Sequence, residues 1–300
     1  MTKRIAEFVN YHIHGDGECN NVVLKAWADK HKLNFEQRYE LAYFFSITYC
    51  VESAIILFEE QRKVFEGVNA WVTKNKASLV FQSDRKYIRM KDSFERCLLQ
   101  FKKVTPSKVV LSKVMENGTI ILSKAIPFVS SWELFGRFSA FLFLETLVEL
   151  TGISIENTTI DWKNGNTATS GLLNLYGLDN AATTFDKTNK LIVEKGQMDK
   201  MLADILAIIA SAGGDNNVTK VETSLCAYRK FFKGSRYNGY YLDRMLEEIY
   251  AMQNDFPEIS KELISIRALC FDKKYLGEIG GWKGIRKDLK KLYIKEGIIS

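Results

Sequence analysis

The chain has 300 residues, 46% of them hydrophobic, and can bury a sizeable core in one large or two smaller lobes. Its net charge of +6 permits nucleic-acid binding but does not require it. The five cysteines are scattered and no two have C-x-x-C spacing, which argues against a disulfide framework and a zinc site and favours a reducing cytoplasm.

The N-terminus and the apolar runs argue against secretion and membrane insertion. The first residues are charged and lack the long apolar core of a secretion signal. The longest apolar runs, near 138–150 and 203–212, fall short of the roughly 20 residues that cross a bilayer. We therefore expect a cytoplasmic protein without a membrane partner.

Helical periodicity dominates the first half of the chain. Residues 34–62 place apolar side chains on one broad face, and Asn34 is the expected helix cap. Residues 78–82 are expected to form a short strand or an extended connector, Asn117-Gly118 indicates a turn, and Pro127 is expected to end the segment after that turn. Further helices are expected over 92–103, 107–115 and 131–150.

The second half also favours helices. Residues 183–211 predict a long amphipathic helix or a broken pair that ends at Gly213-Gly214-Asp215. The other helices expected here cover 168–177, 219–232, 239–253, 257–271 and 283–296. No repeat or low-complexity linker interrupts this pattern, so the chain is predicted to be mainly α.

A glycine turn at the helix of 131–150 is the most informative local feature. Gly136 has no Cβ, and a helix N-terminus presents unpaired N–H groups with a partial positive charge, so an anion such as phosphate could approach closely. Arg137 adds a cation beside it. Farther along the chain come Asp161, in a loop, and then the helix of 168–177.

This order of glycine turn, helix, loop aspartate and second helix resembles the helix-hairpin-helix and catalytic-aspartate region of DNA glycosylases, over residues 134–177. The resemblance implies that Asp161 stabilises the positive charge that develops on the sugar as the base leaves, and that it can activate water. The alternative is that Asp161 only caps backbone N–H groups. Glycosylases that also cut the backbone carry a Schiff-base lysine two residues after the hairpin glycine, but Phe138 stands there, so water is the expected nucleophile.

Further blocks resemble one branch of that superfamily. They are 84–89 (DRKYIR), 222–230 (ETSLCAYRK) and 239–244 (GYYLDR). The branch includes the α-glutamyl/putrescinyl thymine pyrophosphorylases, also called amino acid:DNA transferases, and glycosylases that remove modified bases from phage DNA. With these blocks the similarity extends loosely over most of the chain, from about residue 35 to 295.

The resemblance implies a mainly α, two-lobed, helix-hairpin-helix glycosylase-like fold with a DNA-binding cleft between the lobes. The central lobe would cover 35–150, with the hairpin near 131–141. The second lobe would be built from 1–34 and 151–300 and would carry Asp161.

Basic side chains interleaved with aromatic ones are the expected DNA contacts, because cations neutralise phosphates and rings stack on an extruded base. The expected DNA-binding residues are Gly136, Arg137, Arg85, Lys86, Arg89, Arg229, Lys230 and Arg236. The expected base pocket contains Glu222, Cys226, Tyr240 and Tyr241. The alternative for each cluster is a solvated helix face whose aromatic side chains lie in the core, with Cys226 as a small buried hydrophobe.

The leading hypothesis is a monofunctional DNA glycosylase that flips out a modified, phage-type hypermodified pyrimidine, excises it and leaves an abasic site. One alternative is an amino acid or polyamine:DNA transferase, which displaces pyrophosphate from a modified pyrimidine in DNA. The other is a non-catalytic helical DNA-binding module. The partner would be double-stranded DNA that carries a modified base.

No cofactor is expected, and no metal. His12, His14 and Cys19 are interpreted as surface or capping residues, because their spacing lacks the second ligand pair of a metal site. We expect the protein to act as a monomer, and a part in phage defence would fit the resemblance.

Overall fold

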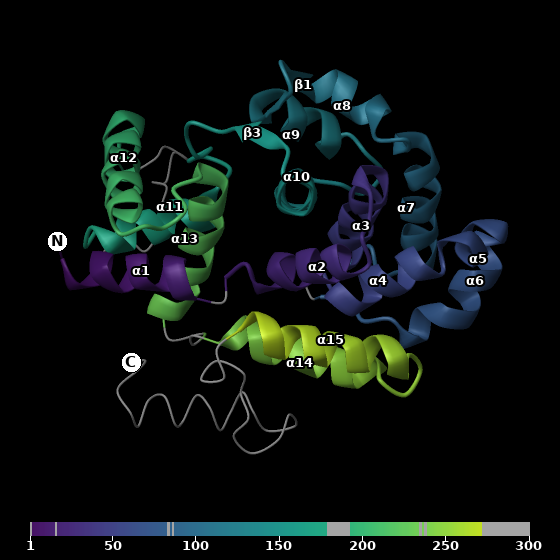
Figure 1. Ribbon diagram of the computed structural model, residues 1–300. Coiled ribbons are helices and arrows are strands. Elements are labelled where there is room, and N and C mark those ends of the chain that lie inside the picture. The colour runs from purple at the N-terminus through teal and green to yellow at the C-terminus, as the bar shows by residue number, and fades with distance from the viewer. Residues whose placement is uncertain are drawn as a thin grey trace. The chain divides into compact units, whose positions relative to one another are not determined.

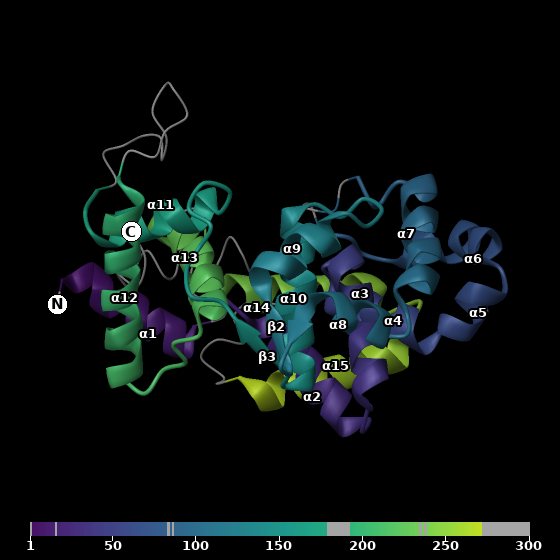
Figure 2. The ribbon, with the colours of Figure 1, turned by 90° about the horizontal axis from the view of Figure 1, so that it is seen from above.

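The computed structural model describes residues 2–15, 17–82, 85, 87–178, 193–233, 236 and 239–271. Over these residues the chain is mainly helical (Figure 1, Figure 2), which confirms the predicted fold class. Lys86, the helix expected over 283–296 and the first part of 183–211 lie outside the described residues. Among the described helices, none is both long enough and apolar enough to cross a bilayer.

The chain divides into two compact units. In their described parts, the first unit comprises 2–19 and 157–243, and the second comprises 20–156 and 244–271. The helices of the first unit are α1 (Lys3–His14), α11 (Asn166–Leu175), α12 (Lys195–Ser211) and α13 (Val218–Phe232). The residues of α14 (Tyr240–Met252) up to Asp243 also belong to it.

The second unit holds most of the elements. Its helices are α2 (Cys19–Lys30), α3 (Phe35–Thr48), α4 (Val51–Glu59), α5 (Gln61–Glu66), α6 (Val68–Asn75), the 3₁₀ turn η1 (Lys76–Ser78), α7 (Lys91–Val104), α8 (Lys108–Val114), α9 (Leu122–Ser130), α10 (Arg137–Thr151), the rest of α14, and α15 (Pro257–Cys270). Its strands are β1 (Met115–Glu116), β2 (Thr119–Ile121) and β3 (Ser154–Glu156).

Within the first unit, α11 and α13 cross where there is no room for a side chain. A Cβ at Gly171 would lie 2.3 Å from the carbonyl oxygen of Leu225. Gly171 therefore lets the two backbones touch. Apolar side chains of the four helices close around this contact, among them Phe8, Leu172, Ile205 and Val221.

Within the second unit, α3 packs against α10 through aromatic side chains. The rings of Tyr39 and Phe143 meet edge to face, with centroids 5.4 Å apart. The hydroxyl of Tyr39 donates to the carbonyl of Val104 at 2.9 Å, and that of Tyr43 donates to the carbonyl of Cys97 at 2.7 Å. These bonds satisfy the polar ends of two fully buried rings.

The start of α3 is as predicted, but residues 34–62 do not form one helix. The side chain of Asn34 accepts a hydrogen bond from Gln37 N at 3.0 Å, which confirms the expected cap. The helix ends at Tyr49, whose φ of 52° is left-handed. The hydroxyl of Thr48 accepts from Cys50 N at 3.4 Å and so offers the backbone an alternative to the helix.

A small sheet follows α8. Strands β1 and β2 are antiparallel around the predicted turn at Asn117-Gly118, and β3 pairs in parallel with β2. Pro127 lies inside α9 rather than ending a segment, which corrects the prediction. Proline has no backbone N–H, so the carbonyl of Ser123, four residues earlier, lacks its helical hydrogen-bond donor. Ser123 is exposed, and water can donate to this carbonyl instead. Residues 79–82 belong to no helix or strand, so the structure agrees with the connector alternative.

Residues 20–34 and 244–271 pack with the rest of the second unit. The indole of Trp27 on α2 donates to Glu262 on α15 at 3.1 Å. Ser260 on α15 lies 2.5 Å from a carboxyl oxygen of Glu52 on α4. These partners are more than 200 residues apart in the chain, so no local pattern could reveal them.

Two carboxyl groups are buried in this part of the second unit. Burial raises the pKa of Glu52 to about 8, and the hydrogen bond with Ser260 offsets only part of that effect. Burial also raises the pKa of Glu248 to about 7 despite the nearby guanidinium of Arg244, whose Nε is 2.8 Å away. A pKa raised on folding contributes stability at low pH, and this stability is lost as pH rises through the folded value.

We predict that Gly171→Ala lowers the thermal midpoint of the first unit, by the equivalent of about 1–3 kcal/mol or more, because the new methyl group meets backbone rather than a movable side chain. Differential scanning calorimetry measures the change. Gly196→Ala is the matched control, because Gly196 is also helical and a Cβ there meets nothing within 4 Å. Equal midpoints for Gly171→Ala and Gly196→Ala would contradict the tight crossing.

We predict that Glu52→Gln raises the thermal midpoint at about pH 9 and changes it little at about pH 5. The wild-type carboxyl has a folded-state pKa of about 8 against an ordinary value of about 4.5, so its stabilising effect is lost as pH rises through the folded value. The amide stays neutral at every pH, and its oxygen can still accept from Ser260. Unfolding scans across this pH range measure the difference. Glu66→Gln, an exposed change on α5, should show no such pH dependence. A parallel pH profile for Glu52→Gln and wild type would refute the buried neutral carboxyl.

Candidate functional site

The N-terminus of α10 is open to solvent. Gly136 is its exposed N-cap, with φ −110° and ψ −174°, an extended conformation that any residue can adopt. A Cβ at this position would meet nothing within 4 Å. The left-handed residue of the turn is Leu134, with φ 60°. Gly136 is thus not needed for the turn, and its effect is to leave the first N–H groups of α10 uncovered.

A buried cation lies against this helix start. Arg85 is 4% exposed, and its guanidinium carbon lies 4.9 Å from the ring centre of Phe138 and 5.6 Å from that of Tyr49. Its Nη1 donates to the hydroxyl of Ser139 in the first turn of α10, at 3.2 Å. Phe138 remains 49% exposed, and its ring meets that of Tyr49 edge to face. We call Arg85, Tyr49, Phe138 and Ser139 the arginine–aromatic cluster.

The other basic residues predicted for this unit are more exposed. Arg137 is half-buried, and its guanidinium lies 6.0 Å from the ring centre of Phe141. Arg89 is exposed in the turn before α7, next to the exposed Tyr87. The structure thus brings Arg85, Arg137 and Gly136 together at the start of α10.

In the first unit, Asp161 lies in the turn that leads to α11. Its side chain is exposed and accepts hydrogen bonds from Asn164 N at 3.2 Å and from Asn164 Nδ2 at 2.8 Å. The segment before and after it is anchored by Asp199 on α12, which accepts from Thr159 Oγ1 and Trp162 Nε1, both at 2.7 Å. The carboxylate of Asp161 is therefore held in a defined turn, as the capping alternative expects, but it also faces solvent.

Glu222 lies beside this turn. It is 4% exposed on α13, and a Cβ at Gly165 would lie 3.3 Å from its Oε1 and 2.9 Å from the carbonyl oxygen of Asp161. A side chain at Gly165 would therefore push the turn away from α13. The structure brings the Asp161 turn and Glu222 together, although 61 residues separate them in the chain.

The remaining predicted residues lie on α13, in the segment after it and at the start of α14. Glu222, Cys226 and Arg229 follow the predicted helical spacing on α13, where Cys226 and Arg229 are half-buried. The Nε of Arg229 is buried and has no hydrogen-bond partner among the described residues. Lys230 is half-buried beside it, and its carbonyl accepts from Arg236 N at 3.2 Å.

Arg236 packs against both predicted tyrosines. Its guanidinium lies 4.5 Å from the ring centre of Tyr240 and 4.7 Å from that of Tyr241. The two rings are perpendicular, with centroids 5.5 Å apart. This cluster combines a cation with aromatic surface, as expected of residues that contact DNA.

A polar contact in the first unit was not predicted from the sequence. His12, expected at the surface, is half-buried and lies 2.6 Å from the carbonyl oxygen of Asp215 and 2.8 Å from the hydroxyl of Ser224. Because a carbonyl only accepts, Nε2 carries the proton and Nδ1 accepts from Ser224. Burial lowers the pKa of His12, so the neutral ring joins α1 to α13. The partners are 212 residues apart, so the sequence carries no local signal for the contact.

The described residues offer cations, aromatic faces and carboxylates, but they contain no group of three or more His, Cys, Asp or Glu side chains that could hold a metal ion. Within the second unit, Arg85 and Phe138 can neutralise negative charge and stack on a planar ring. Within the first unit, Arg236 with Tyr240 and Tyr241 can do the same, and Asp161 can accept a proton.

No curated protein matches the chain. A family model described as amino acid:DNA transferase matches residues 27–237, which include Arg85, the start of α10, Asp161 and the predicted residues of α13. Because this match covers more than half of the sequence, the chain belongs to the amino acid:DNA transferase family.

Proposed function

We propose that the protein is a DNA-modifying transferase that joins an amino acid or a polyamine to a modified pyrimidine in double-stranded DNA and displaces pyrophosphate. The family match over residues 27–237 carries this proposal. It favours the reaction that sequence analysis placed second over the base excision that it placed first. The shared ancestry with helix-hairpin-helix glycosylases, and a DNA cleft between two lobes, remain parts of the proposal.

The reaction has three requirements. The amine nitrogen attacks the exocyclic methylene carbon of the pyrimidine, the bond from that carbon to the pyrophosphate oxygen breaks, and pyrophosphate leaves with the electron pair. The attacking nitrogen then loses a proton. The protein must therefore hold a planar base outside the duplex, neutralise a multiply charged leaving group and accept a proton.

The arginine–aromatic cluster supports the first two requirements. Phe138 exposes half of its surface at the start of α10, where a pyrimidine ring could stack. The guanidinium of Arg85, the cation of Arg137 and the open N–H groups after Gly136 make the same place electropositive. Arg236 with Tyr240 and Tyr241 offers the same combination in the first unit.

Asp161 is proposed as the group that accepts the proton. Asp161 is exposed, and hydrogen bonds from Asn164 help to hold its carboxylate in one orientation. A positioned carboxylate within reach of the amine speeds proton transfer. In base excision the same group would instead stabilise the charge on the sugar.

We predict that the protein, DNA carrying pyrophosphorylated 5-hydroxymethyl pyrimidine, and a mixture of amino acids and putrescine yield a heavier nucleoside and free pyrophosphate. Asp161→Asn should lower the rate by about 100-fold or more at unchanged DNA affinity, because it removes the proton acceptor at nearly constant volume. Mass spectrometry of digested DNA measures the product. Asp92→Asn, an exposed change on α7, is the control.

The products separate the hypotheses. Abasic sites without a heavier nucleoside would establish the glycosylase, and DNA binding without either product would indicate a non-catalytic module. Normal turnover by Asp161→Asn would remove Asp161 from the catalytic site while leaving the transferase function intact.

We predict that Gly136→Asp weakens DNA binding and reduces its dependence on salt, although the fold tolerates the change. There is open space for the side chain, and aspartate is a favourable N-cap, so stability should be equal or higher. The added negative charge repels the phosphate proposed to bind there. The plot of log affinity against log salt falls with a slope of about −0.9 for each phosphate contact, so each lost contact makes the slope shallower by about 0.9.

Gly196→Asp is the matched control for this prediction. It adds the same charge in the first turn of α12, also into open space. Fluorescence anisotropy with a labelled duplex at several salt concentrations measures both affinities. If the two variants bind DNA alike, the start of α10 is not a phosphate contact.

A further inference from the structure

The turn that carries Asp161 is held from both sides by one oxygen atom. Oδ1 of Asp199 on α12 accepts a hydrogen bond from Thr159 Oγ1 and another from Trp162 Nε1, both at 2.7 Å. Thr159 precedes Asp161 by two residues, and Trp162 follows it directly. All four residues belong to the first unit. A carboxylate 37 residues beyond Trp162 therefore bridges the position proposed for the proton acceptor.

The side chains next to Asp161 are buried, whereas its own is exposed. Ile160 is 1% exposed and Trp162 is 2% exposed, and both belong to the apolar core of this unit. The carbonyl of Trp162 also accepts from Thr169 Oγ1 on α11, at 2.7 Å. The turn is thus tied to both α11 and α12, with Asp161 left facing solvent between two buried neighbours.

The carboxylate of Asp161 takes its direction from this backbone. Asn164 N lies 3.1 Å from the carbonyl oxygen of Asp161 and 3.2 Å from its Oδ1, and Gly165 N donates to the same carbonyl at 2.5 Å. These bonds need the turn to keep its shape. A shift of the flanking residues would therefore move the carboxylate too, and a displacement of about 1 Å is enough to slow a reaction strongly.

The helix α12 packs through apolar side chains rather than through Asp199. Its buried residues are Met198, Met201, Leu202, Ile205 and Ile209. Asp199 is half-buried, so water can reach the two donors when its carboxylate is removed. We therefore expect the fold of the unit to survive the loss of this side chain, although the turn would lose two of its ties to α12.

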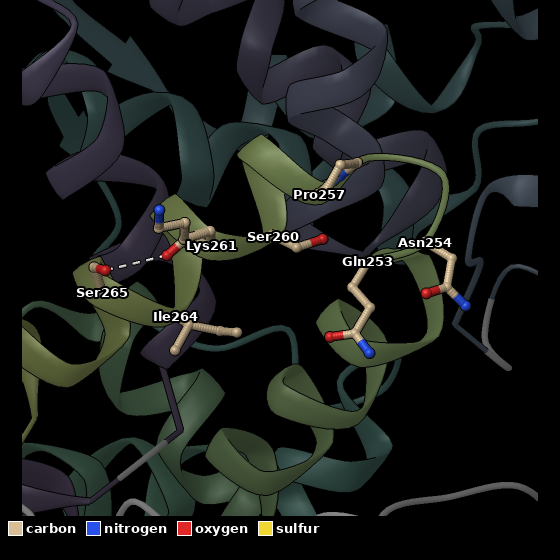
Figure 3. A pocket seen from close by; sticks show the side chains of 7 residues that line it. All are labelled: Gln253, Asn254, Pro257, Ser260, Lys261, Ile264 and Ser265. Atoms are coloured by element: carbon tan, nitrogen blue, oxygen red, sulfur yellow. Dashed lines mark hydrogen bonds between the residues drawn. The ribbon is translucent and has the colours of Figure 1, made fainter.

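A polar groove in the second unit, between the turn after α14 and one face of α15, has no comparable group (Figure 3). None of the residues that line it carries a carboxylate. Figure 3 shows the side chain of Lys261 directed away from the groove, and the hydroxyl of Ser260 donates to Glu52. The groove therefore supplies no carboxylate to accept a proton and does not compete with Asp161 for that role.

We propose that Asp199 is a positioning residue for the transfer reaction. By holding Thr159 and Trp162, it fixes the direction in which the carboxylate of Asp161 meets the attacking amine. Asp199 contacts neither the DNA nor the amine in this role, and it acts only through the turn. The proposal rests on the proposed function, because it takes Asp161 as the group that accepts the proton.

Substitutions at Asp199 test this role. Asp199→Ala should lower kcat for pyrophosphate release by about 10- to 100-fold and leave the KM for DNA unchanged, because a misplaced carboxylate accepts the proton less well. Asp199→Asn should restore most of the rate, since its amide oxygen can accept both hydrogen bonds. Asp204→Ala, which removes an exposed carboxylate from the same helix, is the matched control.

A double-mutant cycle with Asp161→Asn shows whether Asp199 acts through Asp161. In that background, Asp199→Ala should reduce the remaining rate by less than about twofold, because the group that it positions is already gone. Losses that multiply would overturn the proposal, and so would wild-type turnover by Asp199→Ala. Thr159→Val removes one donor at nearly constant volume, so it should lower kcat in the same way and tests the proposal even if Asp199→Ala does not fold.

Hydrogen exchange provides a readout that does not depend on turnover. The amides of Asn164 and Gly165 should exchange faster in Asp199→Ala than in wild type, because their acceptors on Asp161 move, and Asp204→Ala should leave them unchanged. Unchanged exchange in Asp199→Ala would overturn the positioning role alone. A wild-type protein that releases no pyrophosphate would instead overturn the proposed function and the positioning role with it, so the two failures are distinguishable.

Discussion

A cation buried at the positive end of a helix is costly, and the start of α10 depends on how the protein offsets that cost. Arg85 has lost nearly all contact with water, although the N-terminus of α10 repels it. The faces of Tyr49 and Phe138 and the hydroxyl of Ser139 compensate in part. Under the proposed function, an anionic group that docks beside Phe138 would meet this positive charge.

The same constraint explains why α3 ends where it does. Tyr49 takes a left-handed conformation directly after α3, and this turns the chain so that its ring can lie near Arg85 and Phe138. A continuous helix over 34–62 would satisfy the apolar periodicity but would carry this ring elsewhere. The broken helix is thus a local departure from pattern at a place where the proposed function needs a specific side chain.

Local signals in the sequence predicted local structure well. The cap at Asn34, the turn at Asn117-Gly118 and helices such as α7, α8 and α11 each depend on neighbours within a few residues. Contacts across the chain were not predictable in this way. The buried partners of Glu52 and His12 come from residues more than 200 positions away, and a single sequence carries no trace of that pairing. For the candidate site, residue types identified Arg85 but could not tell that it is buried among rings rather than exposed to phosphate.

Base excision and pyrophosphate displacement need different chemical groups at the substrate. Both need a base turned out of the duplex, but excision concentrates charge on the sugar, whereas displacement concentrates it on a leaving group attached to the base. A carboxylate near the sugar stabilises the charge that develops during excision, whereas cations near the base stabilise the leaving group during displacement. The exposed ring of Phe138, which contacts the guanidinium of Arg85, fits the second requirement better.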